Sequence, residues 1–253
     1  MFAPFLFILG LAIGSFLNVC IDRLSKNKSL MGRSQCDFCK KKLQARDLIP
    51  VASFFLLKRR CRHCKKKLSW YYPLIELLTA FAFILIWTYI PAQNDTVRLV
   101  YLGIFTMFVG IFFADLKYQI IPDEFQVALL LFGAALFYLT GASLNGLSGL
   151  VINGLVVMAP MYLLYLITDG KGLGFGDVKL SFVIGFLFGI VGGFIALYIG
   201  FVLGAIVGVL LLFLGKKKWK SKIAFGPFLV LGSIGILIFG HNLIAIATKL
   251  YPF

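Results

Sequence analysis

Residues 178–214 read VKLSFVIGFLFGIVGGFIALYIGFVLGAIVGVLLLFL, a run in which Lys179 carries the only charge. A helix that crosses the hydrocarbon core of a bilayer needs about 20 apolar residues, so this run is long enough for two crossings. We expect the chain to turn at the glycine pair Gly192–Gly193. The stretch therefore predicts two membrane helices, over residues 178–192 and 194–214.

The rest of the chain has the same apolar character. Hydrophobic residues make up 60% of the sequence and charged residues 14%, and the mean hydropathy is +0.96, more than a soluble core needs. No basic residue precedes the first apolar stretch, so we expect a retained anchor and not a removable signal peptide. The chain is predicted to be an all-α, polytopic membrane helix bundle of about eight transmembrane helices. Six of these helices are expected near residues 2–21, 73–91, 98–115, 124–140, 147–168 and 224–247.

The net charge is +15, and the basic residues are concentrated in two segments. Asp22–Tyr72 holds fifteen Lys and Arg residues and Lys216–Lys222 holds five more, of 25 in the chain. Basic loops beside membrane spans stay in the cytoplasm and attract anionic lipid, so we place both segments there. Alternation of the spans then puts Asp115 and Asp177 at the same cytoplasmic edge of the membrane. Since no nucleic-acid recognition motif accompanies the charge, we expect no nucleic-acid binding.

Four cysteines form two Cys-x2-Cys pairs in the first basic segment: Cys36 with Cys39, and Cys61 with Cys64. Thiolates at this spacing suit one tetrahedral zinc ion, although the spacer of 21 residues is just beyond the usual zinc-ribbon range. Two disulfides are the alternative, but a cytoplasmic loop lies in a reducing compartment. His63 is a weaker candidate ligand because four cysteines already complete the set. The pattern predicts a small zinc-ribbon-like loop over residues 23–72 that zinc helps to fold.

Two aspartates, Asp115 and Asp177, stand at the ends of apolar stretches. An ionisable group in hydrocarbon costs about 2.5–3.5 kcal/mol, so such residues are usually functional or paired. Two carboxyl groups within hydrogen-bond range share one proton, which lets one activate a water while the other protonates a scissile carbonyl. Gly174 and Gly176 would allow a substrate backbone to approach closely. The alternative is that Asp177 only caps the helix that follows it.

Several short motifs occur together in a recognisable order. The N-terminal half contains GSFLNV at residues 14–19, the paired Cys-x2-Cys, DLIPV at 47–51 and YPLIELL at 72–78. The C-terminal half contains Asp115, IPD at 121–123 and GFGDVKL at 174–180. In this order, from about residue 10 to about residue 210, the sequence resembles the type IV prepilin peptidases. It departs from them at Asp37, where the first cysteine pair of the family commonly has proline.

The resemblance implies an aspartic endopeptidase of the Gly-x-Gly-Asp class in the bacterial inner membrane. Its substrates would be prepilins or pseudopilins, from which it removes a basic leader after a glycine at the cytoplasmic face. By motif, Asp115 and Asp177 would be the catalytic pair. Asp123 is the rival of Asp115, and its alternative role is to cap the helix that begins at Glu124. Residues expected to support the catalytic loops are Asp123, Gly174, Gly176 and Lys179.

Many members of the family also methylate the new N-terminal residue with S-adenosylmethionine, and the resemblance alone implies this activity here. The sequence contains no nucleotide-binding glycine fingerprint. Glu76, the acid within the second span, is the candidate substrate or methyl-transfer residue, and an ion pair with the basic loop is its alternative role. The basic loop should repel a basic leader, so Asp37, Asp47 or membrane phosphates are candidates to guide the substrate.

We expect three regions along the chain. Residues 1–95 would form an N-terminal membrane region with the cysteine loop, 96–214 the peptidase membrane domain, and 215–253 a basic cytoplasmic loop and a last transmembrane helix. Two other classes of protein also fit part of the pattern: an ion- or proton-coupled transporter, and a non-catalytic subunit of a pilus or secretion machine. A transporter usually carries its carboxylates near the membrane midplane and not at span ends. The oligomeric state stays open.

Overall fold

The computed structural model is all-α and describes residues 2–36, 38–90, 92–141, 146–215 and 224–250, with side chains up to Gly240 in the last range. Two predicted features, Asp37 and the basic segment Lys216–Lys222, lie outside the described residues. The chain divides into two compact units, Met1–Ala92 and Gln93–Phe253, each described here by itself. The division expected above into 1–95, 96–214 and 215–253 stays a prediction.

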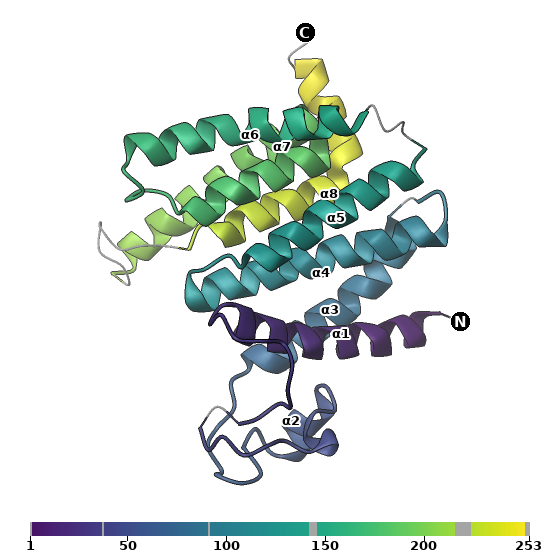
Figure 1. Ribbon diagram of the computed structural model, residues 1–253, viewed down its shortest axis with the longest axis vertical. Helices are drawn as coiled ribbons and strands as arrows, with labels where there is room; N and C mark the ends of the chain where they lie inside the picture. Colours follow the sequence, from purple (N-terminus) through teal and green to yellow (C-terminus); the bar gives the residue numbers. More distant parts are fainter. Residues whose placement is uncertain (1, 37, 91, 142–145, 216–223, 251–253) are drawn as a thin grey trace. The chain divides into compact units, whose positions relative to one another are not determined.

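Two long helices, α1 (Ala3–Leu24) and α3 (Tyr71–Tyr89), form the membrane part of the first unit and pack on each other (Figure 1). Their backbones approach closely because α1 carries Gly10 and Gly14 four residues apart on one face. A Cβ atom at Gly10 would lie 2.6 Å from the Cα of Ala80, and one at Gly14 would lie 2.7 Å from the Cα of Glu76. Small residues at this spacing are a common way for helices to associate in lipid, where apolar side chains gain little from leaving their surroundings.

The segment between α1 and α3 contains little regular structure. It holds a short 3-10 helix, η1 (Ala45–Asp47), a single turn of helix, α2 (Ala52–Leu56), and two isolated β-bridges, Gln35 with Lys42 and Arg60 with Lys67. Each bridge closes one of the two cysteine turns. Where the segment leaves α1, the Arg23 guanidinium donates hydrogen bonds to successive backbone carbonyls, at 2.6 Å to Leu30 and 3.0 Å to Met31. A basic side chain therefore shapes the start of the loop.

The second unit contains five helices in the described residues (Figure 1). They are α4 (Asp95–Tyr118), α5 (Asp123–Leu139), α6 (Leu147–Ile167), α7 (Phe175–Phe213) and α8 (Gly226–Leu250). Helix α4 packs against α5 and α8, and α7 packs against α5, α6 and α8. The side chains of Ile104, Phe108 and Ile111 on α4 are almost completely buried, so α4 supplies much of the core.

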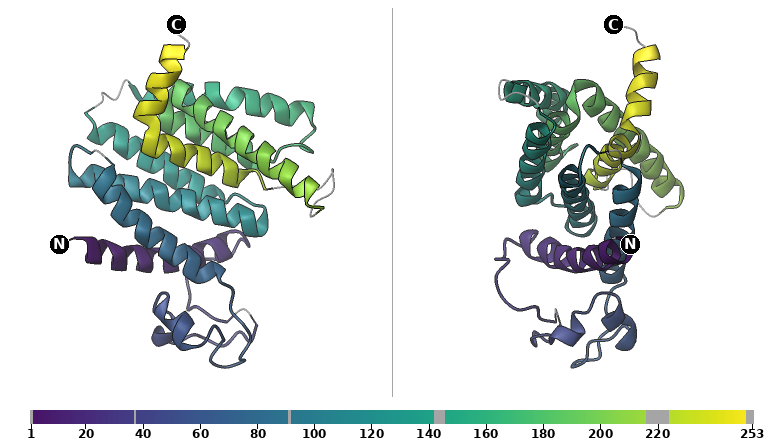
Figure 2. Two further views of the ribbon diagram at one scale, coloured as in Figure 1. Left: turned by 180° about the vertical axis from the view of Figure 1, so that it is seen from behind. Right: turned by 90° about the vertical axis from the view of Figure 1, so that its right-hand side faces the viewer.

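Helix α7 is folded back on itself at Gly189. This residue has φ 72° and ψ −176°, a conformation open to glycine because it has no Cβ. A Cβ at Gly193 would lie only 3.2 Å from the Cα of Gly185, a separation that a straight helix cannot give to residues eight apart. The two arms of this hairpin can be followed in Figure 2.

The turn was expected at Gly192–Gly193, and that boundary is wrong by three to four residues. Both glycines are helical and buried, and a Cβ at Gly193 would lie 2.8 Å from a methyl group of Val157 on α6. These glycines permit close helix packing, whereas Gly189 supplies the backbone freedom for the turn. Sequence composition does not distinguish the two uses of glycine.

Five helices in the described part of the chain are long and apolar enough to span a membrane: α1, α3, α4, α6 and α7. Helix α5 has 17 residues, and the apolar part of α8 with described side chains, Gly226–Gly240, is also shorter. Every apolar stretch expected to form a helix is helical in the structure. The chain is a multi-pass membrane protein.

The close approach of α1 and α3 can be tested at one glycine. Gly10→Ala should lower the midpoint of thermal unfolding in detergent, because the new Cβ meets the backbone of Ala80, which cannot move without separating the helices. Overpacking of this kind costs about 1–3 kcal/mol. The matched control is Gly149→Ala in α6, where nothing lies within 4 Å, and it should leave the midpoint unchanged or slightly raised. Equal midpoints for the two variants would contradict this account.

Candidate functional site

The ends of two helices bring Asp115 and Asp177 near each other in the second unit. Asp115 lies in the last turn of α4 and Asp177 in the first turn of α7. Both residues are buried, at 6% and 8% exposure, and the negative charge of Asp115 acts on Asp177. Two residues 62 positions apart in the sequence are thus brought close enough to interact electrostatically, and they are called the carboxyl pair below. Such a pair cannot be doubly ionised without a large electrostatic cost.

Asp115 has a backbone partner that the sequence analysis missed. The N–H of Gly226, at the start of α8, donates to Oδ2 of Asp115 at 2.9 Å. A Cβ at this glycine would lie 2.8 Å from the same oxygen. The sequence does contain a signal, since Gly226 precedes Pro227 at the first turn of the last apolar stretch, where helices commonly begin with proline. Nothing in that signal indicates which side chain the glycine would approach.

Asp177 is not the N-cap residue of its helix, so the N-cap position considered for it is wrong. The N-cap residue of α7 is Gly174, and Asp177 is the third helical residue after it. The backbone of Gly174 makes a hydrogen bond with the Asp177 carboxyl group, but Oδ1 is buried without a hydrogen-bond partner among the described residues. A Cβ at Gly176 would lie 3.3 Å from the Cβ of Ile121, so this glycine allows the α4–α5 loop to approach α7.

Asp123 occupies a different environment from Asp115. It is the first residue of α5, it caps nothing, and its side chain is 66% exposed. Its carboxylate pairs with the ammonium group of Lys179 on α7. The capping role considered for Asp123 is therefore wrong, and the pair connects the start of α5 to the second turn of α7. The structure buries Asp115 and leaves Asp123 at the surface.

The four predicted ligand cysteines converge in the first unit. Their Sγ atoms all lie within 4.8 Å of one another, and those of Cys36 and Cys64 are 3.9 Å apart. All four are free thiols, and His63 is not a member of the cluster. This donor set is consistent with a tetrahedral zinc site of four thiolates. Two separate disulfides, the alternative considered, are not formed in the structure.

Local interactions shift the pKa values of two of these thiols, Cys36 and Cys61, in opposite directions. Burial raises the pKa of Cys36 to about 11. At Cys61 burial acts in the same direction, but hydrogen bonds from the backbone of Cys64 and His63 lower the pKa to about 7. A turn that directs backbone N–H groups at sulfur favours the thiolate, which is the form that binds a metal.

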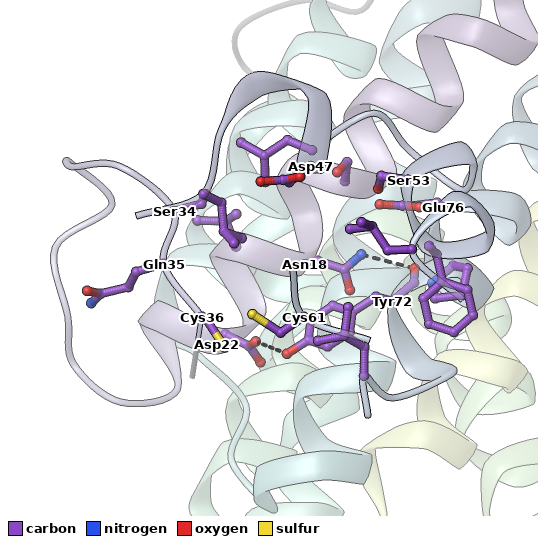
Figure 3. A pocket seen from close by; sticks show the side chains of 18 of the residues that line it. Asn18, Asp22, Ser34, Gln35, Cys36, Asp47, Ser53, Cys61, Tyr72 and Glu76 are labelled. Atoms are coloured by element: carbon purple, nitrogen blue, oxygen red, sulfur yellow. Dashed lines mark hydrogen bonds between the residues drawn. The ribbon is translucent and has the colours of Figure 1, made fainter. Parts of the chain in front are cut away.

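A cavity of about 260 Å³ lies between α1, α3 and the cysteine segment of the first unit. Figure 3 shows the polar side chains that line it. The amide of Asn18 donates to the backbone oxygen of Tyr72 at 3.1 Å, and the Tyr72 hydroxyl donates to Asp22 at 3.0 Å. Oδ1 of Asn18 is buried with no hydrogen-bond partner in the described part of the chain. A residue that lines the cavity therefore has one buried acceptor whose hydrogen bond is unsatisfied among the described residues.

Glu76 lines the same cavity and is 7% exposed. Its carboxylate accepts a hydrogen bond at 2.7 Å from the backbone N–H of Val51, and no basic side chain is paired with it among the described residues. The ion pair considered as its alternative role is therefore wrong. Val51 has φ 58°, which is unusual for a β-branched residue, so the bond to Glu76 holds a strained part of the loop.

Asp47, considered as a guide for a basic leader, already has a cationic partner within the loop. Its side chain is almost completely buried and pairs with Arg62 at 2.8 Å. Burial tends to raise the pKa of Asp47, but the hydrogen bonds from Arg62 and the backbone of Gln44 lower it. Asp47 thus joins the 3-10 helix to the second cysteine turn and is not free to bind a leader. Asp37, the other candidate, lies outside the described residues.

Residues 8–90 match the bacterial peptidase A24 N-terminal domain, and residues 101–209 match the type IV leader peptidase family. The two matches occur in the order in which the cysteine cluster and the carboxyl pair appear. The chain belongs to the type IV leader peptidase family.

Curated relatives of this family match most of the chain. One, named prepilin leader peptidase/N-methyltransferase, from Pectobacterium carotovorum subsp. carotovorum, is 30% identical over 268 residues, covering 93% of each chain. A protein with the same name from Bacillus subtilis (strain 168) is 29% identical over 250 residues, covering 97% of each. Another from Myxococcus xanthus (strain DK1622) is 34% identical over 195 residues, 73% of this chain and 56% of that protein. No solved structure shows a significant match.

The cysteine cluster predicts that the purified leader peptidase carries one zinc ion per chain, measurable by elemental analysis. Cys61→Ser should lose the metal and make the loop more sensitive to protease. The reason is that the loop buries few apolar side chains, so its fold depends on the metal. Cys20→Ser is the matched control, since Cys20 is buried in α1 outside the cluster, and it should keep the zinc. Wild-type protein without zinc would refute the site.

Proposed function

We propose that this member of the leader peptidase family is a prepilin leader peptidase and N-methyltransferase. It cleaves a basic leader from prepilins or pseudopilins after a glycine and then methylates the new N-terminal residue. The observation that carries the peptidase assignment is the buried pair Asp115 and Asp177, which lies within the segment matched to the family. The relatives' names supply both activities.

The carboxyl pair can hydrolyse a peptide bond without a covalent intermediate. One carboxylate takes a proton from a water molecule as the water oxygen bonds to the scissile carbonyl carbon, and the other carboxyl group donates its proton to the carbonyl oxygen. When the C–N bond breaks, the leaving nitrogen takes a proton from the first carboxyl group. The tetrahedral intermediate returns the other proton as the new carboxyl group forms. Both aspartates end in their starting protonation states.

The neighbouring residues support this assignment by shaping the loops around the pair. Gly174 and Gly176 leave space at the start of α7, and Gly176 lets Ile121 approach. The ion pair of Asp123 with Lys179 connects the loop after α4 to the helix that carries Asp177. We assign these residues supporting roles and no direct part in the proton transfers.

We propose eight membrane crossings, counting the two arms of the α7 hairpin separately. Two crossings, α5 and α6, separate the end of α4 from the start of α7, so Asp115 and Asp177 return to the same membrane face. The basic segments assign this face, and the zinc loop, to the cytoplasm of a bacterial inner membrane. A leader in the cytoplasm joined to an apolar helix in the bilayer would present its scissile bond at this level. Anionic lipid headgroups then remain as a guide for the basic leader.

For the methyltransferase we propose the cavity of the first unit, with Glu76 as its candidate site residue. S-adenosylmethionine would supply the methyl group when bound. The cavity is lined by charges of both signs: the carboxylates are Asp22, Asp47 and Glu76, and the cations are Arg23, Lys26, Lys28, Lys40 and Arg62. Such a lining matches a zwitterionic ligand that carries both a carboxylate and positive groups, as S-adenosylmethionine does. Glu76 would hold the loop at Val51 against the cavity and favour a positive charge nearby.

The peptidase assignment predicts the effect of removing each charge. Asp115→Asn and Asp177→Asn should each lower cleavage of a purified prepilin in detergent by about 100- to 10,000-fold, the range of general acid–base catalysis. The matched control Asp123→Asn removes an exposed ion pair and should cost less than about tenfold. An active Asp115→Asn enzyme would overturn the pair. Folded wild-type protein without turnover would favour the transporter or the assembly subunit.

The methyltransferase assignment predicts a separation of the two activities. Glu76→Gln should reduce N-methylation of cleaved pilin, detected by mass spectrometry of its N-terminal peptide, while cleavage continues. The reason is that Glu76 and the carboxyl pair belong to different compact units. Unmethylated product from the wild-type enzyme supplied with S-adenosylmethionine would limit the protein to peptidase activity.

A further inference from the structure

The hydrogen bond from Gly226 to Asp115 joins residues 111 positions apart, and it is made by the end of a helix. The backbone oxygen of Phe225 accepts from the N–H of Phe228 at 3.0 Å, and Pro227 has no N–H. The N–H of Gly226 therefore has no acceptor within α8, as is usual for the first N–H groups of a helix. It points at Oδ2 of Asp115 and brings the positive end of the helix dipole to that oxygen.

The contact needs glycine. A Cβ at Gly226 would lie 2.8 Å from Oδ2 of Asp115 and 3.0 Å from Cδ1 of Ile121. Both distances are shorter than a normal carbon contact, and the carboxylate is the group that would have to move. The residue identity at the start of α8 thus sets the position of the Asp115 carboxyl group.

The two members of the carboxyl pair are held differently. Asp115 accepts a hydrogen bond from another helix across the unit, whereas the backbone partner of Asp177 is Gly174, at the N-cap of its own helix. Oδ1 of Asp177 is buried and has no partner among the described residues. A negative charge on a buried oxygen without a donor is costly, so that oxygen is suited to carry a proton.

We propose that Gly226 is a positioning residue that orients Asp115 as the charged carboxylate which activates the water, leaving Asp177 to protonate the scissile carbonyl. This inference rests on the proposed peptidase function and goes beyond it, because it assigns one role to each aspartate and gives Gly226, at the start of α8, a part in orienting one of them. The proton leaves water for Asp115, and the Asp177 proton passes to the carbonyl oxygen.

The test is steady-state cleavage of purified prepilin by the full-length Gly226→Ala variant in detergent. The added Cβ displaces Oδ2 from its donor, so kcat should fall about 10- to 100-fold. KM should stay unchanged, because no contact to the leader is altered. The matched control Gly235→Ala lies in the same helix with nothing within 4 Å, and it should keep the wild-type kcat. Rates are taken per folded molecule from the monodisperse fraction.

A second variant separates displacement of the carboxylate from crowding of the apolar neighbour. Ile121→Val removes Cδ1, so the double variant Gly226→Ala with Ile121→Val relieves that contact and keeps the one to Asp115. Its kcat should stay low, and it also replaces Gly226→Ala in the test should the single variant fail to fold. A wild-type kcat in either variant would overturn the positioning role. If Asp115→Asn itself cleaves, the proposed catalytic pair has failed, whereas inactive Asp115→Asn beside fully active Gly226→Ala refutes this inference alone.

Discussion

The burial of two carboxyl groups at the ends of apolar helices is the constraint on which the second unit depends. Hydrocarbon gives an ionised oxygen no compensation, so the protein has to provide it from backbone groups that helices leave unused. Asp115 receives the N–H of Gly226 from the start of α8, and Asp177 receives a backbone hydrogen bond from Gly174. The starts of α8 and α7 therefore lie where their unpaired N–H groups can stabilise the charge of a buried carboxylate.

Glycine makes these arrangements possible in three distinct ways. At Gly189 the backbone turns through a conformation that other residues avoid, and α7 becomes a hairpin. At Gly10 and Gly193 it allows two helices to approach each other. At Gly226 it allows a backbone N–H to reach a carboxylate. Glycine thus permits a backbone turn, close helix packing or a backbone hydrogen bond to a carboxylate. Only the residues around each glycine show which of these it does.

The first unit solves a different problem, because its long loop has few apolar side chains to bury. Polar interactions replace a core: Arg23 binds successive carbonyls, Asp47 pairs with Arg62, and Glu76 holds the backbone at Val51. The cysteine cluster adds a site that a metal can crosslink. These interactions surround a cavity of about 260 Å³ instead of filling it.

The sequence by itself determined the helical class, the membrane location and the four-cysteine set. Hydrophobic runs and the spacing of the Cys-x2-Cys pairs are local properties, and local properties can be read along the chain. It also identified Asp115 and Asp177 as residues whose burial costs free energy, because an ionisable side chain next to an apolar run can be recognised without a structure.

Only the tertiary structure decided how those residues are used. It placed the α7 turn at Gly189 and not at Gly192–Gly193, and it paired Asp123 with Lys179 instead of with a helix end. It also brought Gly226 to Asp115 across 111 residues. These outcomes depend on which helices pack together, and contacts between distant segments leave no periodic pattern in the sequence.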